Sequence, residues 1–129
     1  MIEIADLYQR AVTALTRTRH ASYRLQLGPR LTFDDVAALA PYLSALGVSE
    51  AYLSPCFRCG PGSSHGYDVT DPNSFNPEVG NEQSFDRMGR ALDERGLGII
   101  LDVVPNHMGI AADSNPWWLD VLENGPSSP

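Results

Sequence analysis

The sequence has few of the features that would direct it to nucleic acid or to a membrane. Lys and Arg together number 9 against 16 Asp and Glu, giving a net charge of −7. A nucleic-acid-binding domain would be expected to carry a basic patch, and anionic membranes also attract basic segments. No apolar run reaches the ~20 residues of a membrane-spanning helix, and the N-terminus lacks the basic and apolar regions of a signal peptide. We therefore expect no nucleic-acid partner, no membrane partner and a cytoplasmic location.

Cysteine is also scarce, because Cys56 and Cys59 in Cys-Phe-Arg-Cys are the only two. A redox pair would have this spacing but would normally open a helix after a strand. Here Gly60 and Pro61 begin a loop. A zinc site could include His65, but a second pair of ligands is missing. We expect two reduced loop thiols, with a redox pair or a zinc site as the alternative.

What the chain does have is an ordinary globular composition, 43% hydrophobic and 19% charged over 129 residues. Its clearest feature is the apolar, β-branched run at 97–104, which is typical of a strand buried on both faces of a parallel sheet. Pro105 ends this run because proline cannot donate to a ladder.

Polar side chains surround the end of that strand, namely Asp102, Asn106 and His107. Ligands bind at the carboxyl ends of strands in parallel α/β folds, which favours a binding site here. The alternative from spacing alone is structural, since strand-end polar residues also form turns. In that alternative Asp102 and Asn106 satisfy backbone groups and His107 is a partly buried, hydrogen-bonded ring.

The remaining elements alternate between helix and strand. Amphipathic spacing predicts a helix over 1–20, and alternation predicts a strand over 22–27. A capping-box start at Thr32 and Asp35 predicts a helix that ends at Gly47, with a kink or break at Pro41. A strand at 48–53 follows.

After this strand, the composition of 56–80 predicts a long loop that contains His65-Gly66-Tyr67-Asp68. Loops of this length in compact domains are usually functional or disordered. Asn81 then caps a helix that extends to Gly96, and the tail 111–129 is expected to be irregular.

The order is therefore a helix followed by β-α-β-α-β, which gives a parallel sheet through right-handed crossovers. An open doubly wound sheet is one solution, but no G-x-G-x-x-G follows the first strand. We favour the other solution, an α/β fold that comprises the first three β/α units of a (β/α)8 TIM barrel, truncated and preceded by an N-terminal helix.

Two motifs carry a family resemblance. Asp102-Val-Val-Pro-Asn-His107 resembles the first signature region of the α-amylase family of glycoside hydrolases and transglycosylases, which closes barrel strand three. His65-Gly66-Tyr67-Asp68 is similar to the loop after strand two that supplies a stacking tyrosine in that family. Three further stretches, at 23–27, at 52–55 with 61–72, and at 115–118 with 120–128, resemble the branch that rearranges maltooligosaccharides into trehalose-ended products.

We divide the chain into three segments. Residues 1–20, which the resemblance does not cover, form the N-terminal amphipathic helix predicted from spacing. The resemblance implies that 21–110 are the N-terminal part of the catalytic barrel and 111–129 the start of a segment inserted after strand three. It also implies an intramolecular transglycosylation in which the reducing-end α-1,4 bond of a maltooligosaccharide becomes the α,α-1,1 bond of trehalose. The catalytic carboxylates of such enzymes, which include an Asp nucleophile and a Glu acid/base, lie on strands four, five and seven. We therefore expect no catalytic carboxylate in this chain, no activity of the chain alone, and the remainder of the barrel as its missing partner.

By the same resemblance, the site residues are the ones that contact or frame a sugar. His107 would hydrogen-bond sugar hydroxyls and Tyr67 would stack on the ring. His65 and Asp68 are weaker candidates for framing the site. Asp102 and Asn106 would support it. Asn106 binds calcium in many α-amylases, but this branch is not generally metal dependent, so we expect no metal and no cofactor.

Three alternatives remain at this stage. The chain could belong to another α-amylase-type glucosidase or amylase, although many α-glucosidase-like relatives have Asp where this chain has Ser64. It could instead bind maltodextrins without chemistry, although an open barrel piece would expose strand edges and an apolar face. Trp117 and Trp118 could line the sugar path or fill a core.

Overall fold

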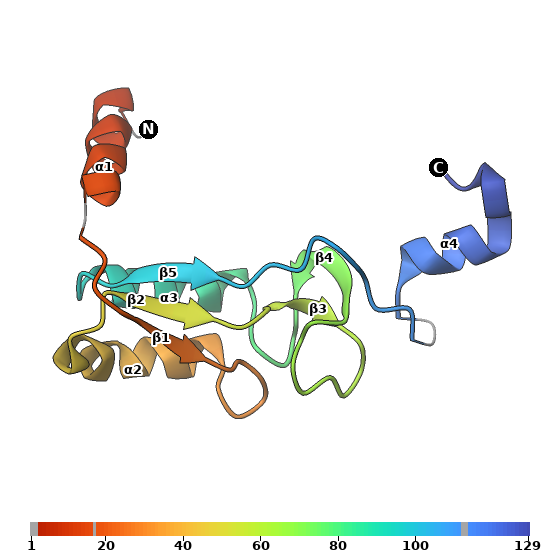
Figure 1. Cartoon of the computed structure of the whole chain (residues 1–129), viewed down its shortest axis with the longest axis horizontal. Helices are drawn as coiled ribbons and strands as arrows, with labels where there is room; N and C mark the ends of the chain where they lie inside the picture. The colour runs from red at the N-terminus through yellow and green to blue at the C-terminus, as the bar shows by residue number, and fades with distance from the viewer. Residues whose placement is uncertain (1–2, 17, 112–113) are drawn as a thin grey trace.

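The computed structural model of the chain describes residues 3–16, 18–111 and 114–129. A parallel sheet with strand order β1-β2-β5 forms its centre, from β1 (Ser22–Leu25), β2 (Glu50–Leu53) and β5 (Gly98–Leu101). Helices α2 (Phe33–Leu46) and α3 (Glu82–Asp93) pack against each other and cover one face of this sheet (Figure 1). A parallel sheet with helices in its crossovers fits part of a (β/α)8 barrel.

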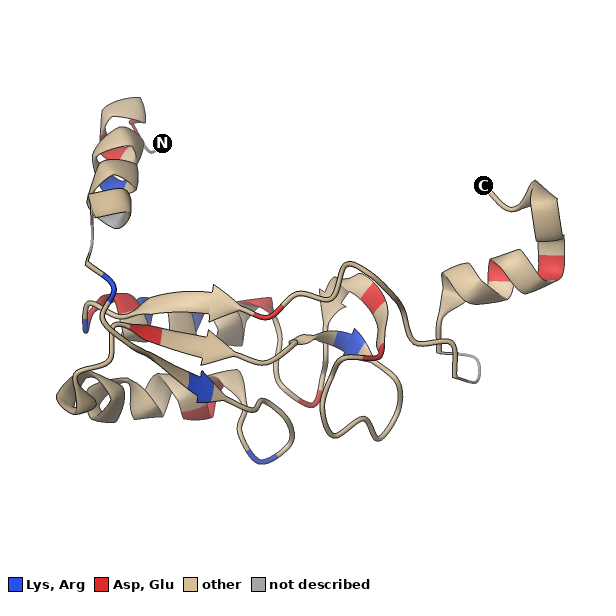
Figure 2. Cartoon of the chain, in the orientation of Figure 1, with Lys and Arg blue, Asp and Glu red and all other residues tan. Residues whose placement is uncertain are grey.

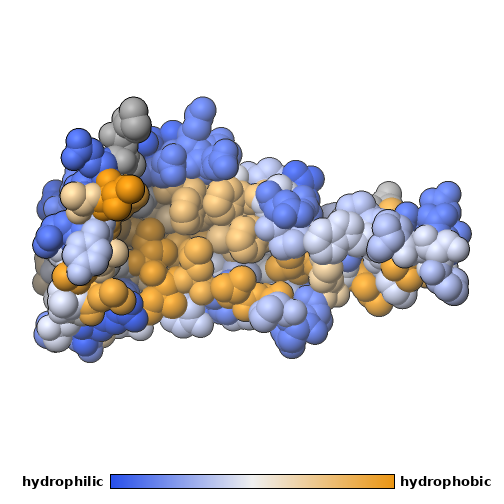
Figure 3. Space-filling model, turned by 90° about the horizontal axis from the view of Figure 1, so that it is seen from above, coloured by the Kyte–Doolittle hydropathy of each residue, from blue (hydrophilic) through white to orange (hydrophobic). Residues whose placement is uncertain are grey.

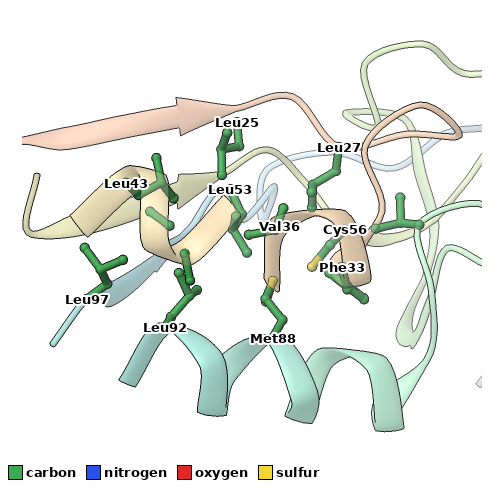
Figure 4. Packing of buried hydrophobic residues seen from close by; sticks show 13 residues of the cluster. Leu25, Leu27, Phe33, Val36, Leu43, Leu53, Cys56, Met88, Leu92 and Leu97 are labelled. Atoms are coloured by element: carbon green, nitrogen blue, oxygen red, sulfur yellow. The ribbon is translucent and has the colours of Figure 1, made fainter. Parts of the chain in front are cut away.

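The core lies between the sheet and these two helices (Figure 4). Leu25 and Leu53 are register partners on the covered face, and they meet Met88 and Leu92 of α3 in one apolar cluster. Phe33, which is fully buried, adds edge-to-face contacts at 5.3 Å to two further rings, Phe75 and Phe85. The core therefore packs one face of the sheet against the helices, and the opposite face remains available for other contacts.

Local sequence signals determine the starts of α2 and α3 and the end of α2 as predicted, whereas α3 ends at Asp93, before the predicted end at Gly96. Thr32 and Asp35 form the capping box of α2, and Gly47 caps its end in the left-handed conformation. Asn81 caps α3. The predicted break at Pro41 is wrong, because α2 is continuous around it. Packing of the buried neighbours Ala40 and Leu43 offsets the one helical hydrogen bond that proline cannot donate.

The strands are shorter than predicted, and β5 is less buried. Its final ladder bond runs from the Asp102 N–H to the Leu53 carbonyl (3.0 Å), after which the chain leaves the sheet. Ile100 and Leu101 remain 36% and 38% exposed, so burial on both faces is wrong. Within the described part of the chain β5 is an edge strand with helices on one face only. Figure 3 shows apolar surface over the middle of the molecule.

Residues 56–80 are more ordered than a loop. They include β3 (Phe57–Cys59) and β4 (Val69–Phe75), which pair in antiparallel orientation with register shifts. Pro72 and the irregular register explain why no clean alternation marked these strands in the sequence. The long segment between β2 and α3 is thus a small folded unit, which lies beyond the carboxyl ends of the parallel strands (Figure 1).

Both ends of the chain carry helices that lie apart from the sheet (Figure 1). Helix α1 (Ile4–Thr16) confirms an N-terminal helix, although residues 1, 2 and 17 lie outside the described part. The predicted extension to residue 20 is wrong, because 18–20 are not helical. The prediction of an irregular tail is wrong, because α4 (Pro116–Asn124) and a 3-10 turn (Gly125–Ser127) form there. None of the helices in the described ranges has the length and apolar character needed to cross a membrane.

Candidate functional site

A polar cluster occupies the carboxyl end of the parallel sheet. Arg24, Tyr52 and Ile100 are register partners on β1, β2 and β5. Because strand side chains alternate, Asp102 points to the same face as Ile100, away from the core helices. Arg24 lies within β1, and Asp102 directly follows β5. Figure 2 shows basic colour on β1 and acidic colour at the end of β5. Sheet geometry thus brings together residues that are far apart in the sequence.

Asp102 is the centre of this cluster. Its Oδ2 accepts hydrogen bonds from the Tyr67 hydroxyl at 2.5 Å, the Tyr52 hydroxyl at 3.2 Å and Arg24 Nη2 at 3.3 Å. The hydrogen bond to Asp102 raises the pKa of the Tyr67 phenol, while Arg24 opposes that rise. The bond to Tyr67 in turn raises the pKa of the Arg24 guanidinium. Among the described residues, the partners of the Asp102 carboxylate are therefore side chains, in contrast to the alternative in which it satisfies backbone groups.

Tyr67 reaches this cluster because of the loop that carries it. Gly66, with φ +75°, lies so close to Pro55 that a Cβ would stand 2.9 Å from the Pro55 carbonyl oxygen. The Gly66 N–H donates to Ser63 Oγ at 3.1 Å. A side chain at position 66 would be strained and crowded. Glycine in the His-Gly-Tyr-Asp motif thus lets the loop fold tightly over β2, and this fold places Tyr67 at the cluster.

His65 and Asp68 flank Tyr67 in the same loop. The Tyr67 N–H donates to His65 Nδ1 at 3.0 Å, and this nitrogen lies 3.8 Å from Asp68 Oδ1. Asp68 also accepts a short hydrogen bond from Ser63 Oγ. These contacts hold the loop together, while the Tyr67 hydroxyl alone extends to Asp102. Tyr67 therefore bonds to Asp102, whereas His65 and Asp68 stabilise the loop itself.

Asn106 and His107 lie in the segment that follows β5. Both are exposed, and among the described residues neither side chain makes a hydrogen bond to the Tyr67–Asp102 cluster. The alternative of His107 as a partly buried ring is therefore wrong. Two residues further on, the Gly109 N–H donates to the Val69 carbonyl at 2.8 Å. This backbone contact fixes the segment beside the loop and leaves His107 accessible.

Sequence reasoning assigned no role to Arg24 or Tyr52, yet both contact Asp102. The alternation over 22–27 correctly placed Arg24 on the face opposite Leu25. Nothing in that alternation indicated which residues of other strands lie beside it. Strand register supplies this information, and it comes from the packed sheet.

The cysteines are both free, and they differ in environment. Cys56 is a member of the buried core, where burial raises the pKa of its thiol to about 11. Burial also raises the pKa of Cys59, whose Sγ accepts a hydrogen bond from the Asn76 side chain at 3.3 Å. A reactive redox thiol needs a lowered pKa, so this environment disfavours the redox alternative.

Comparison with known proteins assigns a family to this fold and site. A model of the alpha amylase catalytic domain matches residues 33–128. The chain belongs to the α-amylase family. Among curated α-amylase relatives it is 45% identical over 114 residues to a protein named as a maltooligosyl trehalose synthase in Mycobacterium tuberculosis (strain H37Rv). That match covers 84% of this chain and 15% of the relative.

Solved structures of α-amylase-type enzymes show the same relationship. The maltooligosyltrehalose synthase from Arthrobacter ramosus matches with a TM-score of 0.81 and 43% identity, over 84% of this chain and 14% of that one. The α-amylase from Geobacillus thermoleovorans matches with a TM-score of 0.72 and 25% identity, over 83% of this chain and 27% of that one. The chain thus spans about 15% of the length of the curated synthase that it matches.

Proposed function

We propose that this chain supplies part of the catalytic domain of a maltooligosyl trehalose synthase, a (1→4)-α-D-glucan 1-α-D-glucosylmutase. The observation that carries the proposal is the difference between two structural matches of almost equal coverage. Similarity to the Arthrobacter synthase is higher in both TM-score and identity than similarity to the Geobacillus α-amylase. The enzyme would convert the reducing-end α-1,4 bond of a maltooligosaccharide to the α,α-1,1 bond of trehalose.

In this proposal residues 21–110 contribute the first three strands and two crossover helices of the (β/α)8 barrel. Residues 1–20 precede the barrel, and 111–129 begin the segment inserted after strand three. The parallel order β1-β2-β5 and the helices on one face support this assignment. The catalytic carboxylates would come from later strands, so the chain in isolation would lack synthase activity.

The sugar site is proposed at the carboxyl end of the sheet. Tyr67 would present its ring to a glucose unit, because the C–H face of a sugar packs well on an aromatic surface. His107, which is exposed beside this loop, would donate to sugar hydroxyls. Asp102 and Asn106 would support these two residues, with His65 and Asp68 framing the loop. The 2.5 Å contact between the Tyr67 hydroxyl and Asp102 supports a fixed ring position.

The test is a product assay on the complete gene product with maltoheptaose. A synthase removes reducing ends without releasing small sugars, and it yields a non-reducing oligosaccharide that ends in trehalose. Release of glucose or maltose as the main product would instead identify another α-amylase-type hydrolase. Saturable binding without any turnover would identify a maltodextrin-binding protein.

A further inference from the structure

Arg24 makes the contacts that connect the first strand to the rest of the cluster. Its Nη2 lies 2.9 Å from the Tyr67 hydroxyl and 3.3 Å from Asp102 Oδ2. Its Nη1 donates to Gln26 Oε1 at 3.2 Å. The guanidinium carbon also lies 5.2 Å from the centre of the Tyr52 ring. A single side chain thus contacts residues from β2, the loop after β2 and the end of β5.

These contacts use both hydrogen-bonding functions of the Tyr67 hydroxyl. It donates to Asp102 and accepts from Arg24, so two strands hold one phenolic oxygen. With Asp102 alone, the ring could pivot about a single hydrogen bond. The planar guanidinium suits the second contact because its fork offers several donors in fixed directions and stacks on an aromatic face.

We propose that Arg24 is a positioning residue, which acts through Tyr67 by locking its hydroxyl against Asp102 and so fixing the ring that receives the sugar. This inference rests on the proposed function, since it assumes that Tyr67 contacts a sugar. Arg24 itself need not touch substrate for the role. Its side chain is 38% exposed, against 16% for Asp102, so it lies at the rim of the cluster.

The experiment compares kcat and KM of the complete gene product and its variants on maltooligosaccharides. The variants are Arg24→Met, Arg24→Lys, Tyr67→Phe and the double variant Arg24→Met/Tyr67→Phe. Arg87→Met is the matched control, because Arg87 also bonds a carboxylate, Asp34, through Nε (3.0 Å) and Nη2 (2.9 Å), but on the outer helices. Thermal unfolding of each variant shows whether the fold persists.

We expect Arg24→Met to lower kcat/KM about tenfold, the scale for loss of a hydrogen bond to a charged group. Tyr67→Phe should have an effect of similar size. The double variant should be little worse than the worse single variant, because both remove the same arrangement. Arg24→Lys should restore part of the activity, and Arg87→Met should match the wild type.

Two results would overturn the inference: unchanged kcat/KM in Arg24→Met, or fully additive losses in the double variant, which would indicate that Arg24 acts without Tyr67. If Arg24→Met does not fold, Arg24→Lys replaces it in the same cycle. The product assay on the wild type separately tests the proposed function. The ratios of kcat/KM between each variant and the wild type test the role of Arg24 for whichever sugar reaction the wild type catalyses. If the wild type catalyses no sugar reaction, crystal structures of Arg24→Met (or Arg24→Lys) and Arg87→Met test the role of Arg24 instead. The Tyr67 hydroxyl should lose its hydrogen bond to Asp102 only in the Arg24 variant.

Discussion

Gly109 packs directly on the main chain of Asp68. A Cβ at position 109 would lie 2.6 Å from the Asp68 carbonyl oxygen, a distance that real Cβ contacts essentially never show. The Gly109 N–H also donates to the next carbonyl, that of Val69, at 2.8 Å. This close approach connects the segment that carries His107 to the loop that carries Tyr67.

Gly109→Ala should therefore destabilise the protein by about 1–3 kcal/mol, because the segment after β5 must move away from the loop. The matched control is Gly89→Ala in α3, where a Cβ would meet nothing within 4 Å. We expect that control to be neutral or to stabilise by about 0.5–1 kcal/mol. Urea denaturation measures both. Equal midpoints for Gly109→Ala and the wild type would contradict the close packing.

Asn115 anchors α4 in two directions. Its Oδ1 accepts from the N–H groups of Trp117 (3.0 Å) and Trp118 (3.1 Å), and its Nδ2 donates to the Gly109 carbonyl at 2.8 Å. We expect Asn115→Ala to cost about 1–2 kcal/mol through loss of the cap and to speed amide hydrogen exchange throughout α4. Asn124→Ala is the control, since Asn124 is exposed and, within the described ranges, its side chain bonds only Asp120, at 2.8 Å. Similar exchange in the two variants would argue against an anchoring role.

The two cysteines should resist alkylation in the folded protein. Burial raises the pKa of Cys56 to about 11, so almost no thiolate is present at neutral pH. We expect iodoacetamide to modify Cys56 only after denaturation, as followed by mass spectrometry of the tryptic peptide. Rapid labelling of the native protein at pH 7 would contradict its place in the core.

The same shift predicts a pH dependence of stability. The folded-state pKa of Cys56 lies above the ordinary thiol value of 9.0, so folding disfavours the thiolate. The Cys56 thiol makes its full contribution to the free energy of unfolding below pH 9. This contribution decreases as the pH rises toward 11, because the thiol ionises first in the unfolded chain. Cys56→Ser should flatten this part of the profile of unfolding free energy against pH.

His107→Asn should lower kcat/KM for maltooligosaccharides in the complete gene product without changing its unfolding midpoint. His107 is exposed and, within the described chain, makes no hydrogen bond whose loss would weaken the fold. His20→Asn is the control, because His20 is an exposed histidine just before β1, at the opposite end of the parallel strands. Equal activity of the two variants would remove His107 from the proposed sugar site.

Features that depend on neighbouring residues could be predicted from the amino-acid order alone. Thr32 and Asp35 marked the start of α2, and Asn81 marked that of α3, because capping hydrogen bonds join residues only three positions apart. The β-α-β-α-β order, and with it the parallel sheet, followed from the same short-range patterns.

Contacts between residues that are distant in the sequence required the folded chain. Arg24 and Asp102 are 78 positions apart, and Tyr67 and Asp102 are 35 apart, so no local period relates them. Strand register and the tight turn at Gly66 place them in contact. Pairing across distant segments also decided the antiparallel strands β3 and β4, which have an irregular register. Helix α4 had a local signal in Asn115-Pro116, but its cap is completed by the distant backbone contact to Gly109.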